Sequence, residues 1–182
     1  MASNDYHFIT RWRMEGQIEE VFGILGDTQG LSRWWPSVYL RVVQLKPGDS
    51  NGLGKEVSLL TKGWLPYTLR WSFRIVEVRP PTSFTLEARG DFIGRGIWTL
   101  EQDGTFVNIL YDWKIRANKA LLRNLSSLLK PVFSANHRWA MAKGEESLRL
   151  ELARRHATSM VSLERIPAPP GPTFNLPVLR RL

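Results

Sequence analysis

The chain has 182 residues, of which 43% are hydrophobic and 23% charged, and its net charge is +8. A chain of this length forms one domain with a substantial core. Because it has no cysteine, disulfides, thiolate metal sites and a cysteine nucleophile are excluded. No stretch approaches the roughly 20 apolar residues of a membrane span, and the first residues lack the apolar core of a signal peptide, so we expect a soluble, cytoplasmic protein.

The positive charge is typical of proteins that bind nucleic acid or anionic membranes. Here, however, the arginines are dispersed along predicted strands, and the densest cluster, residues 149–156, mixes both signs as a solvated helix does. Helix-turn-helix spacing, zinc-finger ligands and an aromatic ribonucleoprotein motif are all missing from the sequence. We therefore expect no nucleic-acid partner.

Apolar residues alternate with polar ones over residues 7–14, which predicts a half-buried first strand. Helical spacing at Ile18, Val21, Phe22 and Leu25 then predicts a short helix. A second short helix follows through residues 31–35 and is ended or bent by Pro36.

Six further strands are predicted from the period-two pattern between residues 38 and 116. They cover residues 38–46, 55–62, 67–78, 83–89, 94–101 and 105–116. Because the connections between them are short, neighbouring strands must be antiparallel. In the strand at residues 67–78, Tyr67, Leu69, Trp71, Phe73 and Ile75 share one face, opposite Arg70 and Arg74, which predicts an aromatic inner face and an arginine-bearing outer face.

The last two strands form a hairpin whose register we predict from its turn. A type I′ turn at Asp103 and Gly104 is favoured by these two residue types. It would pair Leu100 with Val107, Trp98 with Ile109, Gly96 with Tyr111 and, on the outer face, Arg95 with Asp112. The glycines of residues 90–96 would supply a tight connection and room for Tyr111, and Asp91 is interpreted as a turn residue rather than a group at a cavity mouth.

A long helix is predicted over residues 118–155, with Asn118 as its N-cap and a leucine stripe at residues 121–129. Pro131 predicts a bend or a restart near Lys130, and Asn136 is expected to cap or hydrogen-bond there. The inward face would carry Phe133, His137, Ala140, Met141, Gly144 and Leu148. Glycine weakens a helix by about 1 kcal/mol relative to alanine, so Gly144 indicates that another group packs closely against it.

The proline-rich tail, residues 157–182, is expected to be extended or disordered, although Phe174, Leu176, Val178 and Leu179 could dock on a groove. We therefore divide the chain into a ligand-binding domain at residues 1–156 and this tail.

The element order and the stretches "WWPSV", "TKGWLPYTLRW", "GDFIGRGIWTL" and "NHRWAMAKGEESL" resemble the START/Bet v 1-like (SRPBCC) superfamily, in particular its polyketide cyclase/dehydrase and lipid-transport branch. The resemblance covers about residues 6–155. It implies an α+β helix-grip fold, in which a curved seven-stranded antiparallel sheet wraps around the C-terminal helix and two short helices follow the first strand. It also implies a cavity for hydrophobic ligands between sheet and helix, but no catalytic motif.

Trp34 and Trp35 are adjacent, so on a helix their rings point about 100° apart. Either one ring seals the core while the other lines or covers the cavity opening, or both pack, one inward and one against the long helix. Trp64, in the loop at residues 62–66, is expected to be exposed unless a ligand, partner or membrane covers it.

The candidate ligand-binding residues are the large apolar and aromatic side chains of the inner face, with His137. They are Trp34, Trp35, Tyr67, Leu69, Trp71, Phe73, Trp98, Ile109, Tyr111, Trp113, Phe133, His137 and Met141. His7, His137 and His156 lack the spacing and the carboxylates of a metal site, so neither metal nor cofactor is expected. The weak catalytic candidates are His137, as a base or a polar contact, and Tyr111; both have an ordinary structural role as the alternative.

Three functions remain open from the sequence. The first is binding or carrying a small lipidic, aromatic or polyketide-like molecule. The second is a cyclase or dehydratase that uses the same cavity and transfers a proton through His137 or a tyrosine. The third is a surface module that contacts a protein or, weakly, an anionic membrane through the arginines and the tail.

Overall fold

The computed structural model describes residues 5–118 and 126–173, and the side chains of residues 126–129 are not among those described. Seven strands form one antiparallel sheet in the order β1-β7-β6-β5-β4-β3-β2. Their bounds are β1 Asp5–Glu15, β2 Tyr39–Lys46, β3 Glu56–Lys62, β4 Thr68–Arg79, β5 Ser83–Gly90, β6 Phe92–Asp103 and β7 Phe106–Ala117. The helices are α1 Ile18–Gly26, α2 Leu31–Trp34, α4 Ser126–His156 and α5 Met160–Glu164.

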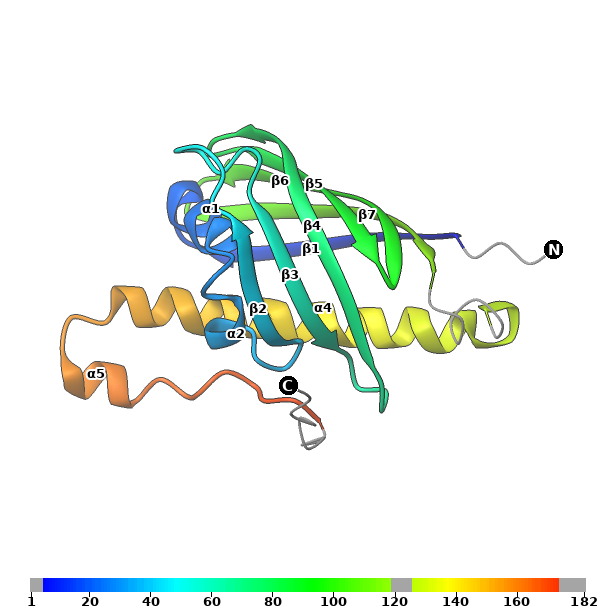
Figure 1. Ribbon diagram of the computed structural model, residues 1–182. Coiled ribbons are helices and arrows are strands. Elements are labelled where there is room, and N and C mark those ends of the chain that lie inside the picture. The colour runs from blue at the N-terminus through cyan, green and yellow to red at the C-terminus, as the bar shows by residue number, and fades with distance from the viewer. Residues whose placement is uncertain (1–4, 119–125, 174–182) are drawn as a thin grey trace.

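The long helix α4 lies across the curved sheet, and the short helices α1 and α2 lie at one end of the sheet (Figure 1). The two short helices come directly after β1, as predicted. The α+β helix-grip class is thereby confirmed. Among the described residues, no helix has the length and apolar character needed to cross a membrane.

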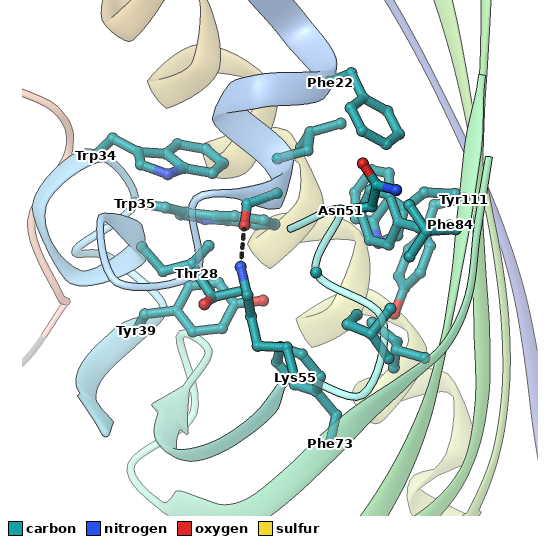
Figure 2. Close-up of a pocket in the computed structure, with 18 of the residues that line it drawn as sticks. Phe22, Thr28, Trp34, Trp35, Tyr39, Asn51, Lys55, Phe73, Phe84 and Tyr111 are labelled. Carbon is teal, nitrogen blue, oxygen red and sulfur yellow. Dashed lines mark hydrogen bonds between the residues drawn. The ribbon is translucent and has the colours of Figure 1, made fainter. Parts of the chain in front are cut away.

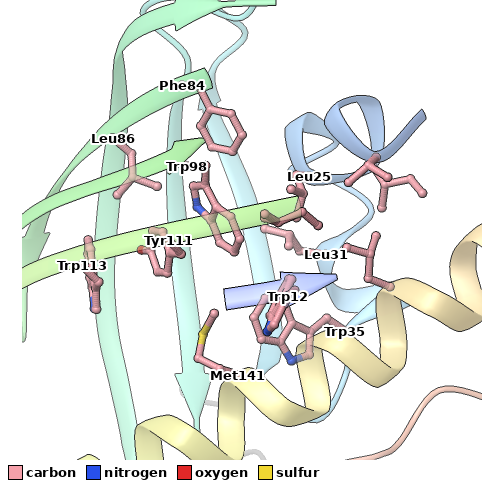
Figure 3. Close-up of a cluster of buried hydrophobic side chains, with 14 of the residues drawn as sticks. Trp12, Leu25, Leu31, Trp35, Phe84, Leu86, Trp98, Tyr111, Trp113 and Met141 are labelled. Atoms are coloured by element: carbon pink, nitrogen blue, oxygen red, sulfur yellow. The ribbon is translucent and has the colours of Figure 1, made fainter. Parts of the chain in front are cut away.

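The sheet has the two predicted faces. Along β4, Trp71, Phe73 and Ile75 are buried, while Arg70 and Arg74 are exposed. The inner face packs against α4 and the two short helices through aromatic rings, with Trp12 and Trp35 lying between sheet and helix (Figure 3). The core therefore occupies the concave side of the sheet, where the candidate site must also lie.

The predicted register of the β6–β7 hairpin is wrong by two residues. Trp98 pairs with Tyr111 and Leu100 with Ile109, while Arg95 lies opposite Lys114 instead of Asp112. The turn is formed by Gly104 and Thr105, and only Gly104 has a positive φ, +60°. A positive φ at the first central position alone is the pattern of a type II′ turn, which places glycine there.

The tryptophan pair at the end of α2 is completely packed. Trp34 is 0% and Trp35 3% exposed, so neither ring covers an opening from outside. A Cβ atom on Gly144 would lie only 2.2 Å from Cζ2 of Trp35. Both rings are therefore packed and neither is a lid, and the close approach predicted at Gly144 is made by the Trp35 indole.

Helix α4 runs through Pro131 as one element, so the restart expected near Lys130 is wrong. Asn118 donates hydrogen bonds to Gly90 and Asp91 at the β5–β6 turn, and the helix start that it was expected to cap lies outside the described residues. The leucine side chains of residues 121–129 and the docking residues at 174–179 also lie outside them. A short helix, α5, interrupts the tail that we expected to be extended or disordered.

Candidate ligand cavity

Two apolar chambers lie between the sheet and α4. The α1-side chamber has a volume of about 90 Å³ and is walled by α1, α2, the loop before β3 and the inner face of β4 to β7 (Figure 2). The His137 chamber has a volume of about 150 Å³ and lies between β1, β3, β4, β7 and the middle of α4. Five residues line both chambers: Trp35, Tyr39, Trp71, Tyr111 and Met141. We call these five residues the waist.

The structure places twelve of the thirteen candidate binding residues on a chamber wall. Trp34, Phe73 and Trp98 line the α1-side chamber; Tyr67, Leu69, Trp113, Phe133 and His137 line the His137 chamber; and Trp35, Trp71, Tyr111 and Met141 belong to the waist. Ile109 is buried but lines neither chamber. It pairs with Trp12 on β1 and Leu100 on β6, at the end of the sheet that the core fills.

The waist contains two tyrosines, Tyr39 and Tyr111, in these apolar surroundings. Burial raises the pKa of Tyr39. Burial also raises the pKa of Tyr111 well above its usual value, and the electrostatic effect of the nearby Tyr39 raises it further. Within the described part of the chain, neither hydroxyl has a hydrogen bond to another residue. The Tyr111 ring is stacked between Trp98, at 4.1 Å between centroids, and Trp113, at 5.6 Å, which fixes its position at the waist.

His137 lies on the inward face of α4 and stacks on Phe8, with 4.1 Å between ring centroids. Burial lowers the pKa of His137 to about 4, and the charge of Arg138 adds to this effect. Its Nε2 atom is buried and has no partner among the described residues. The imidazole is therefore neutral near pH 7 and able to hydrogen-bond, but it is a weak base.

Lys62 is a chamber residue that sequence reasoning missed. It is the last residue of β3, is only 2% exposed and lines the His137 chamber. Burial lowers the pKa of its amino group. The waist residue Tyr39, and Phe22 and Phe84 of the α1-side chamber, were also missed.

Two other polar wall residues, Thr61 and Asn136, have structural partners. Thr61 Oγ1 accepts a hydrogen bond of 2.9 Å from the Trp71 indole, which holds that ring at the waist. Asn136 does not act within a helix kink as expected, because its Oδ1 accepts a hydrogen bond from the Leu65 N–H and it packs on Gly63. It thus ties the β3–β4 loop to α4.

Two other sequence candidates lie away from the chambers. Asp91 lines neither of them and accepts a hydrogen bond from the Arg70 N–H, which agrees with its interpretation as a turn residue. Trp64, at the tip of the β3–β4 loop, is 36% exposed.

The histidines outside the cavity pair with single carboxylates. His7 contacts Asp112 and His156 contacts Glu20, each at 2.9 Å. Within residues 5–118 and 126–173, no group of three histidine, cysteine or acidic side chains is placed to hold a metal ion.

The chain matches no protein-family model and no curated protein sequence. Among solved structures it is similar to the ZhuI aromatase/cyclase from a Streptomyces species, with a TM-score of 0.69 and 14% identity over 85% of this chain and 97% of that chain. It is also similar to TTHA0849 from Thermus thermophilus, with a TM-score of 0.67 and 13% identity over 84% and 100% of the two chains.

A third similar structure is norcoclaurine synthase from Thalictrum flavum in complex with dopamine and hydroxybenzaldehyde. Its TM-score is 0.56, with 10% identity over 85% of this chain and 90% of that chain. At these identities the similarity concerns the fold. The chain shares the helix-grip fold with these structures, as its sequence resemblance implied.

Proposed function

We propose that this protein binds and carries a small hydrophobic molecule in the two chambers. The observation that carries the proposal is the polar lining of the His137 chamber. Nε2 of His137 is buried without a partner among the described residues, and the Tyr39 and Tyr111 hydroxyls have no hydrogen bond to a described residue. Leaving a buried polar group without a partner costs about 1–3 kcal/mol, so this arrangement of His137 is not the one that stability alone would favour. A ligand with an apolar body and one or two polar atoms would satisfy it.

The chemistry of the walls agrees with this function. Buried apolar area contributes about 25 cal/mol per Å², so the aromatic walls would supply most of the affinity. The few polar groups would orient the ligand and provide specificity. The complex of norcoclaurine synthase with dopamine and hydroxybenzaldehyde supports the proposal, because the same fold there accommodates small aromatic molecules.

Native mass spectrometry of protein purified from its own host tests this function. We expect a stoichiometric hydrophobic compound that is released on denaturation and that raises the melting temperature when it is added back. Empty protein, together with unchanged tryptophan fluorescence when lipids and aromatic compounds are titrated, would contradict the proposal.

A second candidate function is a cyclase or dehydratase reaction in the same space. It is favoured by the free hydroxyl of Tyr111 and the neutral imidazole of His137, both of which could hydrogen-bond a reacting carbonyl. The low pKa of His137 argues against it as an efficient general base near pH 7.

Replacing Tyr111 and His137 separately by phenylalanine distinguishes the two functions. A carrier should bind its extracted compound with a dissociation constant changed less than about tenfold, whereas an enzyme should lose about 100-fold or more in turnover. The measurement is mass analysis of the compound after incubation with each variant. A product that forms with the wild type and not with the variants would establish the enzyme.

A further inference from the structure

The Tyr111 hydroxyl lies close to Gly96 on the inner face of the sheet. A Cβ atom at Gly96 would be 2.7 Å from Oη of Tyr111 and 2.7 Å from Cε3 of Trp113, far inside contact distance. Any side chain at this position would therefore displace one of the two rings. Glycine here lets the tyrosine pack against β6 and sets the position of its hydroxyl.

Two indoles hold this hydroxyl in place. The Tyr111 ring is stacked between Trp98 and Trp113, with interplanar angles of 16° and 20°. A half-turn of the ring leaves Oη where it is, because the oxygen lies on the axis of rotation. Tyr111 lines both chambers (Figure 2), yet its hydroxyl has no hydrogen bond to a described residue. It is thus a fixed donor that has no acceptor in the described part of the chain.

The chemistry of a phenol selects the group that pairs with it. A phenol O–H is a strong donor and a weak acceptor, because the oxygen lone pair is delocalised into the ring, whereas a carbonyl oxygen only accepts. Burial raises the pKa of Tyr111 well above its usual value, so the hydroxyl keeps its proton near neutral pH. A carbonyl oxygen would accept this proton in a hydrogen bond and would bring no donor that needs a partner of its own.

The walls favour an uncharged ligand of modest size. Moving a charged group from water to aromatic walls is costly, and the buried Lys62 on the wall of the His137 chamber already has an interaction within the protein. A dry apolar cavity of about 150 Å³ takes up benzene, and the His137 chamber has this volume. Trp71 and Phe92 provide flat surfaces for one ring.

We propose that Tyr111, positioned by Gly96, donates a hydrogen bond to the carbonyl oxygen of an uncharged ligand, and that the ligand is a ketone or aldehyde on a body of about one aromatic ring. This inference rests on the proposed function and gives it a ligand class and a residue that determines specificity. The body lies in the His137 chamber, and the carbonyl group points to the waist.

The first test compares a ketone with a hydrocarbon of the same shape. Acetophenone and α-methylstyrene differ only in that a CH₂ group replaces the carbonyl oxygen. Their dissociation constants are measured by nuclear magnetic resonance titration of isotope-labelled wild-type and Tyr111→Phe protein. We expect the variant to bind acetophenone about fivefold more weakly, equivalent to ~1 kcal/mol, and to bind α-methylstyrene as the wild type does. Equal effects on the two compounds would overturn the assignment.

Infrared spectroscopy of carbonyl-labelled acetophenone reports the hydrogen bond itself. A hydrogen bond to the oxygen weakens the C=O bond and lowers its stretching frequency. We expect the frequency in wild-type protein to lie below that in hexane, and the frequency in Tyr111→Phe protein to return toward the hexane value. A band at the hexane position in the wild type would overturn the inference without any variant.

Tyr39→Phe is the matched control, because it removes the other waist hydroxyl by the same substitution. Tyr39 has one edge contact with Trp35 and lacks the two stacked indoles that fix Tyr111. This variant should keep both the infrared shift and the affinity for acetophenone. Circular dichroism shows that each variant is folded, and a shift that disappears in Tyr39→Phe and persists in Tyr111→Phe would show that Tyr111 is not the donor.

The ligand class and the proposed function fail in different ways. If host-purified protein carries a hydrophobic compound without a carbonyl group, or if Tyr111→Phe weakens both probes equally, the carbonyl assignment is wrong and the carrier function stands. If host-purified protein is empty and neither probe binds, both are wrong.

Discussion

Replacing Gly144 with alanine is expected to lower the free energy of unfolding by about 2 kcal/mol, measured by urea denaturation. The new methyl group would lie 2.2 Å from Cζ2 of Trp35, far inside contact distance. The indole cannot move away easily, because three other rings surround it. The distances between ring centroids are 5.8 Å to Trp12, 5.5 Å to Trp34 and 5.2 Å to Tyr39. Overpacking therefore outweighs the gain of about 1 kcal/mol that alanine brings to a helix interior.

Gly23→Ala is the matched control for this prediction. Gly23 is also a helical glycine, in α1, but it is exposed and a Cβ atom there would meet nothing within 4 Å. The same substitution should therefore raise stability by about 0.5–1 kcal/mol through helix propensity alone. The two variants should shift the urea midpoint in opposite directions, and a stabilising Gly144→Ala would show that Trp35 is free to move.

Sequence periodicity predicted the faces of the sheet, but the register predicted for the β6–β7 hairpin was wrong. Alternation of Trp98 with Thr99, and of Tyr111 with Asp112, fixes which side chains point inward. A shift of two residues leaves every inward residue inward, so the pattern cannot distinguish the expected pairing of Trp98 with Ile109 from the observed pairing with Tyr111. The turn decides the register, and the Asp-Gly signal favoured the wrong turn.

The position of a side chain on the chamber walls follows from the sequence where the strand period holds, and does not where strands end. In β3, Val57, Leu59 and Thr61 alternate inward and are buried, which predicts an outward Lys62. Lys62 is nevertheless buried, because the chain turns there into Gly63, against which Asn136 of α4 packs. Tyr39 was missed for a similar reason, since it lies at the junction of α2 and β2, where neither period applies.

A buried carboxylate connects α2 to α4. The Glu151 side chain is only 3% exposed and accepts two hydrogen bonds from the Arg33 guanidinium, at 2.7 and 2.9 Å, and one from Arg155 at 3.1 Å. Burial raises the pKa of Glu151, but the hydrogen bonds and charges of Arg33 and Arg155 outweigh it and hold the pKa below its usual value. This contact fixes the short helix that carries Trp34 and leads into Trp35.

Arg33→Met is expected to lower the free energy of unfolding by about 2 kcal/mol near neutral pH. The loss stays below the 3–5 kcal/mol typical of a buried charge left alone, because Arg155 remains and the Arg33 side chain is itself 58% exposed. Lys143→Met, which removes an exposed ion pair with Glu146 on the same helix, is the control and should cost only about 0.3 kcal/mol.

The effect of Arg33→Met should depend on pH in one direction. Since the pKa of Glu151 is lowered in the folded protein, its stabilising contribution is complete above the pKa of the unfolded chain and is lost as the pH falls through the folded value. Without Arg33, only Arg155 remains to oppose the effect of burial on the pKa of Glu151, so this pKa is lowered less in the folded variant. The variant therefore has less stability to lose on acidification. The stability difference between wild type and variant, followed by urea denaturation from neutral to acidic pH, should therefore shrink as the pH falls below the usual carboxyl range. A difference that stays constant would mean that Arg33 stabilises α2 by packing rather than by its charge.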